Sequence, residues 1–175
     1  MDTPAGREVE SARDYTALFR VVKRVVEQRL GKSRAGMMLG LASLGLSPSG
    51  FFGGYFVVGS NAIVLNRDVL NYIKLKEPEW HNAYAFHVLL HEYLHTLGYF
   101  TEEEVRPLAH ELSIAALGPE HKATRIAAAM VPGERGDMPA FFRELVFPKF
   151  GVPPARHSPI EIVKGFDPDA ASYIG

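Results

Sequence analysis

The sequence predicts an α+β protein in which a small sheet lies beside several helices. Three observations lead to this fold class. Apolar residues recur every three or four positions over residues 13–30, short apolar runs separated by glycine fill residues 35–66, and helical patterns dominate from residue 67 onward. Together they fit a single domain of 175 residues, of which 47% are hydrophobic, enough to bury a sizeable core.

Composition and charge exclude several classes of protein. The formal net charge is −1, so neither a nucleic-acid partner nor a polybasic membrane surface is expected. The chain has no cysteine, which excludes disulfides and thiolate metal sites and leaves His, Asp and Glu as possible metal ligands. The first residues lack the apolar core of a secretion signal, and every apolar run is too short or too interrupted to cross a membrane. We therefore expect a soluble cytoplasmic protein.

Local patterns predict the N-terminal half element by element. Residues 1–11 are polar and are expected to form a loose tail, and residues 13–30 predict an amphipathic helix that ends at Gly31. The expected strands cover residues 37–41, 55–58 and 62–65. The glycines between them are typical of tight turns between antiparallel strands. Those within residues 50–54 suit either a simple turn or a mobile flap.

Helices dominate the C-terminal half. Thr101 and Glu104 form a capping-box pattern at the start of one helix, and Gly118-Pro119 marks its end. The expected helices cover residues 68–76, 79–97, 101–117 and 120–130. The segments expected outside these helices are a loop at residues 131–139, an irregular stretch at 148–159 and a last strand at 160–163.

The most informative segment is HEYLH at residues 91–95, which matches the pattern HExxH. Two histidines four positions apart on a helix point from one face, so His91 and His95 can both reach one zinc ion at about 2.0–2.1 Å. Glu92 then lies beside the ion and can act as a general base on water. The alternative is a buried helix whose histidines are hydrogen-bonded core residues. Burying three polar groups without partners would cost several kcal/mol, which favours the metal site.

The segment HEYLHTLG resembles the zincin group of metallopeptidases, and the resemblance covers residues 55–125. It is also similar to small prokaryotic zincin-like proteins with an HExxHxxG core. The resemblance implies a small mixed sheet packed on the HExxH helix, with further helices C-terminal and an extended peptide lying along an edge strand near residues 61–65. Metzincins place a third histidine where this chain has Thr101, and threonine is a poor zinc ligand. The chain is therefore not a standard metzincin.

The third zinc ligand is left open by the sequence. His121 ranks first, because it follows Gly118-Pro119-Glu120 where the chain turns back; its alternative role is a capping or surface histidine. The acidic run Glu102–Glu104 ranks second, since a charged helix start also explains it. His110 ranks third because it points away from the apolar face of its helix. His87, one turn before His91, is expected either as a hydrogen-bonded core residue or as a group that orients a ligand.

These residues predict a zinc-dependent peptidase that acts on peptide or protein substrates. One Zn²⁺ would be held by His91, His95 and a third ligand, with Glu92 as the catalytic base. The alternative is a catalytically inactive zincin-like regulatory or binding protein with a structural zinc. A hydrolase of another amide would use the same machinery. No pattern in the sequence indicates an oligomeric state.

Overall fold

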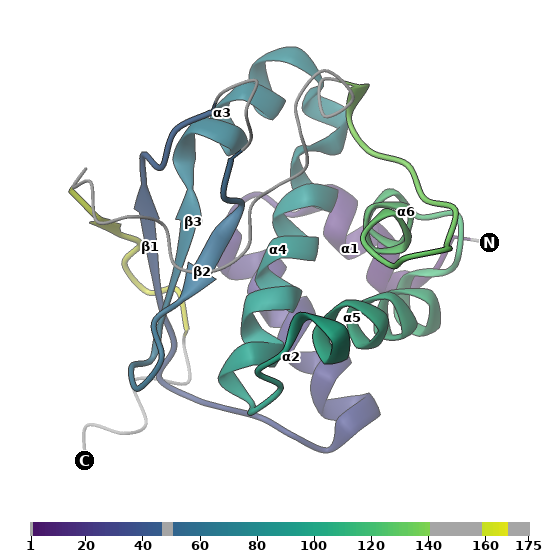
Figure 1. Ribbon diagram of the computed structural model, residues 1–175, viewed down its shortest axis with the longest axis horizontal. Coiled ribbons are helices and arrows are strands. Elements are labelled where there is room, and N and C mark those ends of the chain that lie inside the picture. The colour runs from purple at the N-terminus through teal and green to yellow at the C-terminus, as the bar shows by residue number, and fades with distance from the viewer. Residues whose placement is uncertain (1, 47–50, 141–158, 168–175) are drawn as a thin grey trace.

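The computed structural model describes residues 2–46, 51–140 and 159–167. These residues form an α+β fold, as the sequence predicts, with helices packed against a four-stranded sheet (Figure 1). The helices are α1 (Pro4–Ser11), α2 (Tyr15–Leu30), α3 (Arg67–Lys76), the 3-10 helix η1 (Pro78–Trp80), α4 (His81–Thr96), α5 (Glu102–Leu117) and α6 (Lys122–Ala129). The strands are β1 (Met38–Ala42), β2 (Gly54–Phe56), β3 (Ala62–Asn66) and β4 (Glu161–Ile162).

The sheet is mixed, with strand order β2-β3-β1-β4. The turn between antiparallel strands is confirmed for β2 and β3, but β1 and β3 pair in parallel. The expectation that an edge strand lies near residues 61–65 is wrong, because β3 lies between β1 and β2. Residues 63–66 are all buried, as expected for an inner strand that is covered on both faces. The edge strand on this side is β2.

The first residues form a helix rather than the expected loose tail. Thr3 caps α1 by accepting a hydrogen bond from the backbone of Gly6, and Pro4 occupies the first helical turn. Val9 is fully buried, and the Thr3 hydroxyl donates to the carbonyl of Ala116 in α5 at 2.8 Å. A short polar segment is therefore fixed by its cap and one buried apolar side chain.

The other helices confirm the local patterns to within a few residues. Gly31 ends α2 in the left-handed region, with φ of 63°. The capping box of Thr101 and Glu104 is present at the start of α5. Most of the irregular stretch expected at residues 148–159 lies outside the described residues. No helix in the described part of the chain is both long and apolar enough to span a membrane.

Helix α4 occupies the centre of the molecule, with the sheet on one side and α5 and α6 on the other (Figure 1). Residues 83–94 of this helix are all buried. That burial explains why the helix is apolar on nearly every side. His91 and Glu92 are thus buried inside the protein, whereas His95 is partly exposed.

Two glycines allow β2 to approach α4 closely. A Cβ atom on Gly54 would lie 2.8 Å from the carbonyl oxygen of Val64 and 3.2 Å from Val88 of α4. A Cβ atom on Gly53 would lie 2.8 Å from the hydroxyl of Tyr84, also in α4. The absence of side chains at Gly53 and Gly54 therefore lets the edge strand β2 pack closely on α4, the helix that carries HEYLH. The part of the expected flap around Gly50 lies outside the described residues.

Candidate metal centre

The end of α4 and the start of α5 bring three side chains together. Gly98 has φ of 100°, a backbone conformation that favours glycine, and it lets the chain turn back after α4. Glu102 is the first residue of α5, while Glu104 is engaged in the capping box with Thr101. Glu102 is therefore not used by the cap, and its carboxylate faces His91 and His95 of the motif.

The separations within this cluster match those of ligands around one metal ion. The Nε2 atoms of His91 and His95 lie 3.3 Å apart. Glu102 Oε1 lies 3.3 Å from His91 Nε2 and 3.1 Å from His95 Nε2. Neighbouring ligands of a tetrahedral zinc ion, each about 2.0–2.1 Å from the metal, are themselves about 3.3–3.4 Å apart. The separations of the three donors are therefore compatible with binding of one metal ion.

The tautomer of His95 suits this role. Its Nδ1 lies 2.8 Å from the backbone carbonyl of Tyr99 and donates to it, so in the neutral ring the lone pair is on Nε2, facing Glu102. The hydroxyl of Tyr99 accepts a hydrogen bond from Lys32 at 3.1 Å, and the Lys32 ammonium lies 4.4 Å from the centre of the Tyr99 ring. Tyr99 thus orients His95 through its backbone carbonyl and is itself held by Lys32 through its side chain.

Hydrogen bonds within the cluster shift the pKa values of Glu102 and His95. Burial opposes ionisation of Glu102, but the hydrogen bonds from His91 and His95 outweigh it and hold the pKa of its carboxyl well below its usual value. Burial likewise opposes protonation of His95, yet the hydrogen bond to Glu102 leads the influences that raise the pKa of His95. A carboxylate that raises the pKa of a neighbouring imidazole in this way would also attract a metal cation, which would compete with the proton.

Arg106 fixes the second oxygen of Glu102. Its Nε lies 3.2 Å from Glu102 Oε2, one helical turn along α5. The same oxygen lies 3.1 Å from His91 Nε2, so Arg106 holds the carboxylate with both of its oxygens facing the histidines. Arg106 is not among the residues predicted from the sequence, although its spacing of four residues after Glu102 is the signal that could have identified it.

Glu92 is buried beside the cluster, between α4 and β2. Burial raises the pKa of Glu92, and the attraction of His91 and His95 acts in the opposite direction. Its carboxylate also accepts a hydrogen bond from the backbone N–H of Phe56 at the end of β2. A carboxylate with a raised pKa is closer to the ideal for a general base near neutral pH than an exposed glutamate.

His121 does not join the cluster. It caps α6, with its Nδ1 accepting from the N–H of Ala123 at 3.1 Å. Because Nδ1 accepts this hydrogen bond, the proton of the ring lies on Nε2, which then has no lone pair for a metal; burial lowers the pKa of His121. That nitrogen lies 3.9 Å from a carboxylate oxygen of Glu10.

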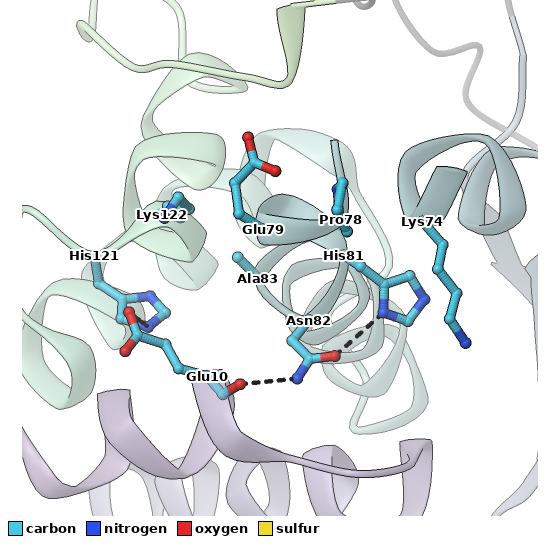
Figure 2. A pocket seen from close by; sticks show the side chains of 9 residues that line it. All are labelled: Glu10, Lys74, Pro78, Glu79, His81, Asn82, Ala83, His121 and Lys122. Atoms are coloured by element: carbon cyan, nitrogen blue, oxygen red, sulfur yellow. Dashed lines mark hydrogen bonds and ion pairs between the residues drawn. The ribbon is translucent and has the colours of Figure 1, made fainter. Parts of the chain in front are cut away.

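The position of His121 also separates it from the motif. It lines a pocket of about 400 Å³ together with His81 and Asn82, the first residues of α4 (Figure 2). His91 lies ten residues further along the helix, which corresponds to about 15 Å. The second-ranked group, Glu102–Glu104, supplies the third donor, and it does so through Glu102 alone. Glu103 and Glu104 are exposed, and His110 lies two turns beyond Glu102.

His87 lies one turn before His91 and is buried. Its Nδ1 has no hydrogen-bond partner among the described residues, and its ring centre is 6.1 Å from that of His91. Burial is the main cause that lowers the pKa of His87 from its usual value of 6.5 to about 3. His87 is therefore a buried core residue, as expected, but its Nδ1 lacks the expected hydrogen bond among the described residues.

This pKa shift predicts a pH-dependent stability. Between pH 6.5 and about 3 the unfolded chain binds a proton at His87 that the folded chain excludes. The contribution to stability is thus complete above pH 6.5 and falls by about 1.4 kcal/mol for each pH unit below it. Measured by urea unfolding of the metal-free protein at pH 7 and pH 4.5, His87→Phe should lose less stability than the wild type. His110→Gln is the control, and equal losses in wild type and His87→Phe would contradict the assignment.

The described arrangement could hold one metal ion with two nitrogen donors and one oxygen donor. Comparisons of the chain with protein-family models, with curated proteins and with solved structures found no match. Among the described residues, no further His, Asp or Glu joins the group.

Proposed function

We propose that the chain is a zinc-dependent peptidase of the zincin type. The observation that supports this function is the convergence of His91, His95 and Glu102, with Glu92 buried next to the first histidine. Two histidines and one glutamate form a catalytic zinc set that leaves a fourth position for water or substrate. A structural zinc site would instead be closed by four protein ligands.

Each residue has a role in the proposed reaction. His91, His95 and Glu102 hold the ion, while Tyr99 and Arg106 keep His95 and Glu102 in position. Zinc, when bound, polarises a substrate carbonyl and lowers the pKa of water towards about 7. Glu92 accepts a proton from the attacking water and then donates it to the leaving amine.

The edge strand β2 is the place where we expect a peptide to bind. It lies against α4 and pairs with β3 on one side only. An extended peptide could add to its other side through main-chain groups other than the Phe56 N–H, which bonds to Glu92, and this would give recognition with modest side-chain specificity. The substrate is therefore expected to be an unfolded segment of peptide or protein.

Metal removal tests this function. Protein stripped with a chelator is expected to lose hydrolysis of denatured proteins and peptide libraries, and one equivalent of Zn²⁺ should restore it, because the three ligands hold the ion that activates water. His110→Ala is a matched control, since it removes a histidine of α5 outside the cluster. A wild-type protein that binds one zinc and cleaves no peptide would refute the peptidase function and favour a structural zinc.

A further inference from the structure

One arginine links the end of the motif helix to the hairpin formed by β2 and β3. Arg34 lies in the segment between α2 and β1. Its Nη1 donates to the carbonyl of Thr96 at 3.2 Å, and its Nη2 donates to the carbonyl of Ser60 at 2.7 Å. Thr96 is the last residue of α4 and directly follows His95, while Ser60 lies in the turn between the two strands. The Arg34 guanidinium therefore connects the end of α4 to the turn between β2 and β3.

The motif helix itself holds Arg34 in place. The hydroxyl of Tyr93, a fully buried residue within HEYLH, accepts from the N–H of Arg34 at 2.8 Å and donates to its carbonyl at 3.4 Å. The guanidinium carbon also lies 5.8 Å from the ring centre of Phe56, the last residue of β2. Both the backbone and the side chain of Arg34 are thus engaged between α4 and β2.

The position of the β2–β3 hairpin affects Glu92 through one backbone group, the N–H of Phe56. The N–H of Val57, the residue after β2, bonds to the carbonyl of Ala62, the first residue of β3. Since backbone groups alternate in direction along a strand, the N–H of Phe56 points to the opposite side, towards α4. There it donates to the carboxylate of Glu92. A shift of the hairpin would therefore move the donor that orients this carboxylate.

We propose that Arg34 is a positioning residue of the metal centre, which holds the β2–β3 hairpin against α4 and thereby orients Glu92. This proposal deepens the proposed function and rests on it for its catalytic consequence. Arginine suits the role because its planar fork can reach two carbonyl oxygens on different elements at once, whereas a lysine ammonium is a single point of contact. Thr96 and Ser60 both accept through their backbone carbonyls, so Arg34 supplies the only side chain in these two bonds.

The test compares Arg34→Ala, Arg34→Lys and Tyr93→Phe in the zinc-loaded protein. Amide hydrogen exchange at Phe56 and Val57 is expected to become at least about tenfold faster in Arg34→Ala. Zinc affinity should stay within about threefold, because no ligand is changed. On a cleaved peptide, kcat should fall at least about tenfold with a smaller change in KM, because a misplaced base slows the chemical step. Added guanidinium ion, at concentrations well below denaturing ones, should restore Arg34→Ala but not Arg34→Lys.

The control variant is Arg24→Ala, which removes an exposed ion pair with Glu8 outside the cluster and should change none of these quantities. Unchanged exchange at Phe56 and Val57 in Arg34→Ala would overturn the proposal, as would faster exchange with an unchanged kcat. If Arg34→Ala does not fold, Tyr93→Phe decides, since it removes only the hydroxyl that holds Arg34. If the wild type cleaves no peptide, the proposed function fails, and the exchange data still decide whether Arg34 holds the hairpin.

Discussion

Glu92→Gln is expected to lower kcat/KM by about 10²–10⁴-fold while zinc remains bound. Glu92 is not among the three donors of the cluster, so its replacement leaves the ligand set intact. A glutamine side chain has nearly the same shape and can still accept from the N–H of Phe56, which preserves the local packing. It cannot accept a proton at neutral pH, and the base of the proposed reaction is therefore lost.

Hydrolysis and zinc content have to be measured on the same samples. The assay is kcat/KM on a peptide that the wild type cleaves, with zinc stoichiometry determined by elemental analysis. Glu103→Gln is the matched control, because Glu103 is an exposed acidic residue outside the cluster. Wild-type activity in Glu92→Gln would show that this carboxylate is not the base, and loss of zinc would show that it helps to hold the ion.

Glu102→Ala is expected to weaken zinc binding at least about a hundredfold, since even the groups that support metal ligands are worth 10- to 100-fold in affinity. Removing this carboxylate deletes the only oxygen donor of the cluster and the anion that pairs with both histidines. His121→Ala should keep full zinc affinity. Its expected effect is a loss of about 1 kcal/mol in stability, because the N-cap of α6 is removed.

A competition titration with a chromophoric chelator measures both affinities, and thermal unfolding measures the stability of His121→Ala. Zinc affinity is expected to fall in Glu102→Ala and to stay unchanged in His121→Ala, so comparing the two affinities identifies the third ligand. Tight zinc binding in Glu102→Ala together with weak binding in His121→Ala would restore His121 as the ligand. Full affinity in both variants would show that the ion is held elsewhere.

Features that depend on neighbours along the chain could be predicted from the sequence. The periodicity of α2, the capping box at Thr101 and Glu104 and the helical spacing of His91 and His95 all concern residues within one or two turns. Local chemistry determines such features, and the structure agrees with each of them. The absence of cysteine restricted the metal ligands in the same direct way.

Features that depend on contacts between distant segments were predicted less well. The parallel pairing of β1 with β3 joins segments separated by the whole of β2, and no turn pattern reveals it. The short helix α1 depends on a buried Val9 and on a hydrogen bond to Ala116 in α5. Both arise from packing that a periodic pattern does not record.

The sequence by itself determined the α+β class, the central helix α4 and the two histidines and one glutamate that this helix carries. Only the tertiary structure selected Glu102 over His121, because the turn at Gly98 places the start of α5 opposite the motif while α6 keeps its capping histidine at the far end of α4. A helix fixes its own side chains by its regular geometry, whereas the third donor comes from a second element whose position is set by packing.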